Sequence, residues 1–247
     1  MIAAAFGANS RARAANGGFI VLSQYDGDTV ATSTFRRANM GNVTTTNDYS
    51  PALTAGDYAH ATTAGDRSHA TTTGDYSRAF TAGDYAHATT AGNFSNAFTA
   101  GDDAHATTAG HLAHALTAGD DAHATTAGNC SRAITAGDFA SATTAGNCSH
   151  AITAGGDAHA TTTGNYAHAL TAGDRAKTSA TGENAIAAAF GANSYARAAD
   201  GGFIVLAQYD GDTVVAVKTA QVGKDGIKPD TWYKLNPTGE FVEVEAA

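Results

Sequence analysis

Histidine is the residue type of this sequence best suited to metal or proton chemistry, and all ten histidines lie in its repetitive middle part. Nine of them occupy one position of a nine-residue repeat: His60, His69, His87, His105, His114, His123, His150, His159 and His168. Histidines two repeat units apart, as in the series His69, His87, His105 and His123, would stack if one turn of the chain takes two units. Imidazoles about 4.8 Å apart could share a zinc ion.

The same repeat position also holds Arg78, Asn96, Arg132 and Ser141. Arginine is a poor replacement for a metal ligand, so we predict a solvated outward column of side chains and no metal site. Zinc binding through the histidine series is kept as an alternative. Stacked imidazoles disfavour each other's protonation, so acid should loosen the structure.

A glycine followed by Asp or Asn recurs every nine residues, which is the period of calcium-binding nonapeptide rolls. Each unit supplies one turn acid at most, and Asn93, Asn129, Asn147 and Asn165 replace it in several units. Ca²⁺ takes six to eight oxygen ligands, more than this pattern offers. Asp and Asn in turns usually bond nearby backbone, so we expect a structural role for them.

Two further series alternate at another repeat position. The threonine series is Thr71, Thr89, Thr107, Thr125, Thr143 and Thr161. Regular threonine arrays on β-solenoids resemble those of ice-binding proteins, so this series could bind ice or another periodic surface. Threonine is also a common strand residue on an exposed face, which is the simpler explanation.

The apolar series is Phe80, Phe98, Leu116, Ile134, Ile152 and Leu170, and its members are again two units apart. If these side chains face outward, they form a continuous stripe, and a long exposed apolar stripe marks an interface. If they face inward, they belong to the core. We favour the outward direction, because the threonine series holds the same phase in the alternate units. Pairing of two or three chains would follow.

Cys130 and Cys148 occupy one repeat position and lie two units apart. A separation of about 4.8 Å lies within the Cα range of a disulfide, but side chains in such a column run parallel. We therefore expect free, buried or half-buried thiols. No His or Asp converges on them as in an activated nucleophile, and no phosphate loop or paired-carboxylate site stands out. We expect no enzyme activity, no cofactor and no small-molecule substrate.

An internal repeat positions all of these candidates. Glycine recurs at every ninth residue, at positions 56, 65, 74, 83, 92, 101, 110, 119, 128, 137, 146, 155, 164, 173, 182 and 191. The repeat spans seventeen units over residues 44–196, and a disordered segment has no reason to keep one register for so long. Nine residues are too few for a helical hairpin but suit one strand and one tight turn, with Gly supplying φ > 0.

The residues between turns alternate as in a strand with one inner face. Ala86, Ala88 and Thr90 share one side, and the more variable His87 and Thr89 share the other. Because the apolar and threonine series alternate, a full coil takes two units. The predicted fold class is all-β: a parallel β-solenoid (β-roll or β-helix) with about 18 residues per coil, built from two nine-residue units, with β-hairpin end segments. Coils stacked about 4.8 Å apart would form a rod of roughly 40 Å.

The two ends of the chain are related. Residues 2–30 differ from residues 186–214 at only three of 29 positions. We predict three parts: an N-terminal β end segment at 1–43, the nonapeptide-repeat solenoid at 44–196, and a C-terminal β-hairpin cap at 197–247.

The C-terminal copy concentrates bulky apolar residues that could cover an open solenoid end: Phe203, Ile204, Val205, Leu206 and Trp232. A solenoid is polar, so one module cannot cap both ends in the same way. The N-terminal copy therefore packs differently, contacts a neighbouring chain, belongs to a longer tandem array, or is an engineered duplication.

Composition excludes several classes of function. A formal net charge of −9 repels nucleic acid, and no run of about 20 apolar residues could span a membrane. Two cysteines in 247 residues exclude a disulfide scaffold. The residues after Met1 lack a basic-then-apolar signal segment, so we expect cytoplasmic synthesis, with a virion or cell-surface destination left open.

The terminal segment 187–244 resembles phage- and bacteria-encoded repeat proteins of unknown function. The similar stretches are FGANSYARA at 190–198, GGFIVLAQY at 201–209 and IKPDTWYKLNPTGEFVEV at 227–244. The unit GDYAHA at 83–88 is also similar to the head repeats of trimeric autotransporter adhesins. The first resemblance implies a β-solenoid with a C-terminal β cap and brings no catalytic residues.

Together these patterns predict a non-enzymatic structural or interaction protein that self-associates as a homo-oligomer and is related to phage. Binding of ice or a periodic surface through the threonine series, and metal binding through the histidine series, are the alternatives.

Overall fold

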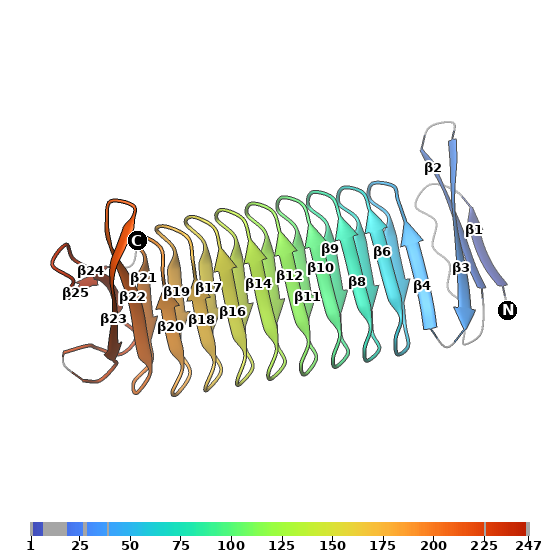
Figure 1. Cartoon of the computed structure of the whole chain (residues 1–247). Helices are drawn as coiled ribbons and strands as arrows, with labels where there is room; N and C mark the ends of the chain where they lie inside the picture. Colours follow the sequence, from blue (N-terminus) through green and yellow to red (C-terminus); the bar gives the residue numbers. More distant parts are fainter. Residues whose placement is uncertain (1, 7–18, 27–28, 39, 225, 246–247) are drawn as a thin grey trace.

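The computed structural model describes residues 2–6, 19–26, 29–38, 40–224 and 226–245. All elements in these ranges are β-strands, and they form one rod of stacked coils with β1 near one end and β25 near the other (Figure 1). The predicted fold class is confirmed: successive strands alternate between two parallel sheets, and equivalent residues of neighbouring coils pair two units apart, as His105 does with His123.

The first sheet, called sheet I here, has 14 strands. In spatial order they are β1 (Ile2–Phe6), β2 (Phe19–Asp26), β3 (Thr29–Ala38), β4 (Met40–Thr45), β6 (His60–Ala64), β8 (Arg78–Ala82), β10 (Asn96–Ala100), β12 (His114–Ala118), β14 (Arg132–Ala136), β16 (His150–Ala154), β18 (His168–Thr171), β20 (Ile186–Ala189), β22 (Phe203–Asp210) and β23 (Thr213–Gln221).

The second sheet, sheet II, has 11 strands. In spatial order they are β25 (Phe241–Val244), β24 (Trp232–Leu235), β21 (Tyr195–Ala198), β19 (Lys177–Ala180), β17 (His159–Thr162), β15 (Ser141–Thr144), β13 (His123–Thr126), β11 (His105–Thr108), β9 (His87–Thr90), β7 (His69–Thr72) and β5 (Pro51–Thr54).

The interior is as narrow as the sequence predicts. In β9, Ala88 and Thr90 are buried while His87 and Thr89 lie on the outer side, and the same alternation repeats along both sheets. The buried alanines of successive coils form one continuous core. Since these methyl groups are small, the two sheets can approach closely, and parallel backbone hydrogen bonding from coil to coil supplies much of the cohesion.

The repeated glycine has a different role from the one expected. The left-handed conformation that is common to all the turns belongs to the residue two positions later, as at Tyr76 (φ 57°) and Phe94 (φ 56°). The glycine itself is required by crowding between coils: a Cβ on Gly110 would overlap the carbonyl group of Gly92 in the preceding coil. The nine-residue glycine period is therefore mainly a record of close backbone contact.

The turn Asp and Asn side chains also act between coils. Their Oδ1 atoms accept a hydrogen bond from the backbone N–H two units later, as from Asp120 to Asp102 (3.0 Å) and from Asn147 to Asn129 (2.9 Å). The expected bond to nearby backbone is thus replaced by one to the next coil. Either residue can supply the acceptor, which explains why Asp and Asn interchange.

The C-terminal end of each sheet finishes in an antiparallel hairpin: β22 pairs with β23, and β24 pairs with both β21 and β25. Ile204, Leu206 and Tyr233 are buried there, whereas Phe203 is 40% exposed. Trp232 is half-buried and lies beneath the guanidinium of Arg197, 4.7 Å from its ring centroid. Only part of the predicted apolar set is therefore buried by the hairpins.

The N-terminal copy does not mirror this end. Strand β2 forms an antiparallel hairpin with β3, and β3 then pairs antiparallel with β4. Strand β4 in turn pairs in parallel with β6, so sheet I runs without interruption from β1 into the repeat. The strand pairing of this copy therefore differs from that of the C-terminal copy, which is the first of the four alternatives that the duplication left open.

Candidate interaction faces

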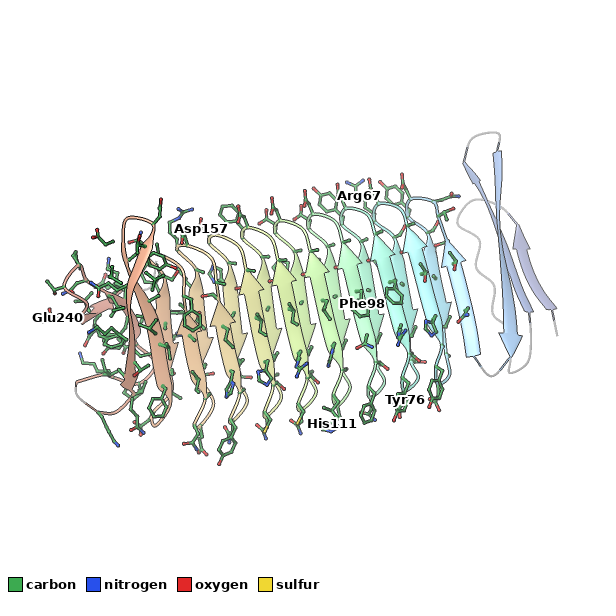
Figure 2. The ribbon with its side chains drawn as sticks, in the orientation of Figure 1. Arg67, Tyr76, Phe98, His111, Asp157 and Glu240 are labelled. Carbon is green, nitrogen blue, oxygen red and sulfur yellow. The ribbon has the colours of Figure 1, made fainter. Side chains whose placement is uncertain are left out.

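The outer face of sheet I carries the apolar series of the sequence. Each member is half-buried between two inward-facing residues of its own strand, and in-register pairing joins them into one line that we call the apolar row: Phe80, Phe98, Leu116, Ile134, Ile152 and Leu170. The rings of Phe80 and Phe98 stack with centroids 5.0 Å apart. Figure 2 shows Phe98 on the broad face of the rod, away from both turn edges. The row therefore points outward.

The outer face of sheet II carries the threonine series, which we call the threonine column. Its members pair in register in neighbouring strands and are half-buried or exposed: Thr71, Thr89, Thr107, Thr125, Thr143 and Thr161. A second outward threonine is present at Thr73 and Thr163, whereas Ala91 and Ala109 hold that position in other coils. The hydroxyl array is thus one residue wide over most of the face.

Beside the threonine column lies the stacked series His69, His87, His105 and His123. The ring centroids of successive members are 4.8, 4.7 and 4.8 Å apart. Partial burial, followed by the neighbouring rings of His105 and His69, lowers the pKa of His87 below its ordinary value. The central rings of the stack are therefore harder to protonate than free imidazole.

On sheet I the remaining histidines alternate with arginine. Burial lowers the pKa of His114, and the adjacent charge of Arg132 lowers it further. Among the described residues, no group of three or more His, Cys, Asp or Glu side chains is arranged to hold a metal ion. The series His69, His87, His105 and His123 is thus a stack of rings that no further ligand type joins in the described part of the chain.

The acidic residues of the repeat gather in the turns. Strands β6 to β19 contain no Asp or Glu, so both broad faces lack carboxylates over this length. The turns that follow sheet I strands form the first turn edge, and those that follow sheet II strands form the second. Figure 2 shows Arg67 and Asp157 along the first edge and Tyr76 and His111 along the second. The rod therefore has two uncharged or weakly basic faces between two more acidic edges.

Side chains also stack along the first turn edge. The guanidinium of Arg67 lies between the rings of Tyr49 and Tyr85, 5.5 and 5.1 Å from their centroids. Further along, Arg175 forms an ion pair with Asp157 of the preceding coil at 2.6 Å. The hydrogen bond from Arg175 lowers the pKa of Asp157.

The second turn edge carries a column of left-handed residues that the sequence pattern did not single out. Tyr58, Tyr76 and Phe94 stack with centroids 5.1 and 4.9 Å apart. The column continues through Leu112, Cys130, Cys148 and Tyr166, all with φ between 54° and 56°. Because this repeat position varies freely in type, its shared backbone conformation leaves no compositional signal. Both cysteines are free; Cys130 is half-buried, and Cys148 is exposed rather than buried.

Comparison of the chain with protein-family models, with curated proteins and with solved structures finds no match. Among the described residues there is also no helix long and apolar enough to cross a membrane. The fold and the outward columns define a β-solenoid rod, and its faces are the features that bear on its function.

Proposed function

We propose that this protein is a non-enzymatic structural rod that self-associates through the outer face of sheet I. The observation that carries the proposal is the apolar row, which crosses six neighbouring strands in register. Burial of apolar area contributes roughly 25 cal/mol per Å², so pairing along the whole row adds many small contributions. No carboxylate interrupts the face from β6 to β18.

A second copy of the same chain is the partner that fits this row best. Its coils repeat at the same inter-strand spacing of about 4.8 Å, so the side chains of two facing rows can alternate over their full length. A partner without this period would meet the row at one or two points only. Face-to-face packing also keeps the acidic turn edges at the periphery, where water and salt screen their repulsion.

The oligomeric state of two lysine-pair variants tests the proposal. Leu116→Lys with Ile134→Lys places two ammonium groups in the middle of the apolar row. Thr107→Lys with Thr125→Lys adds the same charges to the outer face of sheet II and serves as the matched control. Light scattering should find an oligomeric parent, an oligomeric control and a monomeric row variant. A monomeric parent, or a row variant that keeps the parent's mass, would overturn the proposal.

The resemblance of segment 187–244 to phage- and bacteria-encoded repeat proteins supports a place for this rod in a phage or bacterial assembly. A homo-oligomer of stiff rods is suited to such a mechanical role, because parallel solenoids resist bending through continuous backbone hydrogen bonding. The antiparallel hairpins at the C-terminal end also limit further strand addition there.

The threonine column supports a second candidate function, the binding of ice or another periodic surface. Its hydroxyl-bearing residues pair in register, for example Thr107 with Thr125, on a face without carboxylates. Under this candidate the purified protein shows thermal hysteresis, and Thr107→Tyr with Thr125→Tyr removes it by breaking the flat array. Absence of hysteresis in the parent would eliminate this candidate and leave self-association unaffected.

A further inference from the structure

The two cysteines of the chain lie in neighbouring coils of the second turn edge. Cys130 and Cys148 share the same left-handed backbone conformation, with φ of 56° and 55°. Each backbone N–H donates to a turn carbonyl of the following coil, Cys130 to Asn147 at 2.8 Å and Cys148 to Asn165 at 2.9 Å. Equal backbone geometry and equal hydrogen bonding make the two Cα–Cβ bonds nearly parallel.

The separation of side chains in this column is known from its aromatic members. Tyr58, Tyr76 and Phe94 have the same left-handed geometry, and their rings repeat at 5.1 and 4.9 Å. Side chains that leave the edge in parallel keep the spacing of the coils. The Cβ atoms of Cys130 and Cys148 are therefore held about 4.8 Å apart, the inter-strand spacing.

This separation disfavours a disulfide. A disulfide needs Cβ atoms about 3.5–4.5 Å apart, so closing one would pull two hydrogen-bonded coils together. An ion between the sulfurs suits the spacing better. Two metal–sulfur bonds of about 2.3 Å place the sulfurs as much as roughly 4.6 Å apart.

We propose that Cys130 and Cys148 form a two-thiolate site for a soft, two-coordinate cation of the Cu(I) class. Thiolates select soft ions. Zinc is a poor fit, because structural zinc takes four ligands and the described part of the chain offers no third His, Cys, Asp or Glu at this place. On binding, two S–H bonds break, two metal–sulfur bonds form and two protons pass to solvent, with no change in oxidation state.

The surroundings leave the thiols accessible and without competing donors from their own turns. Cys148 is exposed and Cys130 half-buried. The nearby amide oxygens of Asn129 and Asn147 are engaged, since each accepts a backbone N–H of the next coil at 2.9 Å. An ion can therefore approach from solvent and meet the two sulfurs first. The site is independent of the apolar row on sheet I.

The experiment uses the coil register itself as the control. Cys148→Ser with Tyr166→Cys keeps two thiols in the same column but moves them two coils apart, about 9.6 Å. Cys130→Ser with Tyr166→Cys also keeps two thiols and restores neighbouring coils. Tyr166 shares the left-handed geometry (φ 54°) and is exposed, so cysteine fits there.

Each protein is titrated anaerobically with Cu(I) against a chromophoric Cu(I) chelator. We expect the parent and the neighbouring-coil variant to withdraw one Cu(I) per chain, and the two-coil variant to lose at least 10-fold in affinity. Equal binding by the parent and both variants, or no binding by the parent, would overturn the proposal. So would rapid and complete formation of an intramolecular disulfide in the parent with a mild thiol oxidant, because the coils would then not hold the thiols apart.

Discussion

The carboxylate of Asp138 accepts a hydrogen bond from the backbone N–H of Gly156 at 2.7 Å, and Gly156 has no side chain with which to continue the series. On the same edge Asp120 does continue it, accepting the N–H of Asp138 at 2.9 Å. The first turn edge is therefore held by a chain of side-chain acceptors that breaks at one glycine. Beyond the break, the ion pair of Arg175 with Asp157 joins the two coils.

Restoring the missing acceptor should stabilise the rod. Gly156→Asn supplies an amide oxygen for the N–H of Asp174 without adding charge, and Asn already has this role at Asn147. The net gain from one such hydrogen bond is about 1 kcal/mol, visible as a raised midpoint in urea unfolding. Gly156→Ala is the control, because its Cβ meets nothing closer than 3.5 Å and offers no acceptor. An equal gain in both variants would assign the effect to lower backbone entropy instead.

Substitution of a repeated glycine should be far more damaging. In Gly110→Ala the new Cβ overlaps the carbonyl group of Gly92, and backbone atoms cannot yield as a flexible side chain can. We expect destabilisation of about 3 kcal/mol, at the upper end for overpacking, measured by thermal and urea unfolding. Gly156→Ala again serves as the tolerated comparison. A Gly110→Ala protein of parental stability would show that the coils can separate enough to admit the new atom.

The buried threonine hydroxyls predict an unusual gain from an apolar substitution. Among the described residues, fourteen inner threonines, including Thr108 and Thr126, have hydroxyl groups without a hydrogen-bond partner. Valine has nearly the same shape, so Thr108→Val with Thr126→Val removes two unpaired hydroxyls at little steric cost. We expect roughly 1 kcal/mol of added stability per site, read from the unfolding midpoint.

The outward pair provides the control for that experiment. Thr107→Val with Thr125→Val changes hydroxyls that lie on the exposed face of sheet II and should leave the midpoint nearly unchanged. A loss of stability in the inner variant would mean that those hydroxyls are hydrogen-bonded inside the rod.

Acid should destabilise the rod in a defined range. Burial, aided by neighbouring rings or basic side chains, lowers the pKa of six histidines: His60, His87, His105, His114, His150 and His159. The unfolded chain then binds more protons than the folded one, so stability is full above about pH 6.5 and falls as the pH drops below that value. The fall ends once the pH is below the folded-state pKa values.

Thermal unfolding between pH 7.5 and 5.0 measures this slope, in a range where the turn carboxylates are still ionised. His87→Gln with His105→Gln removes two of the contributing rings and should flatten the curve. Arg175→Gln is the comparison, since its partner Asp157 titrates at lower pH. A variant slope equal to the parental one would show that the stacked rings do not cause the loss.

Periodicity made the coil and its faces predictable, whereas contacts between coils did not show in the sequence. The two-unit spacing placed Phe98 beside Leu116 and His87 beside His105, and the alternation around Thr90 assigned the inner face. The role of Gly110 differs from the one that the turn pattern predicts, because a single unit contains no trace of the carbonyl that approaches from the coil before it. The candidate faces were foreseen in outline, and the column at the second turn edge was not.

The pairing of identical positions two repeat units apart also sets how the gene of such a rod can change in length. Loss or gain of two units removes or adds one complete rung and leaves every column continuous. Loss of a single unit transfers everything downstream to the opposite sheet. Without the unit that contains Thr125, for example, Ile134 would follow Thr107 on one side and Thr143 would follow Leu116 on the other. Length in this architecture is therefore tolerant in steps of two units and intolerant in steps of one.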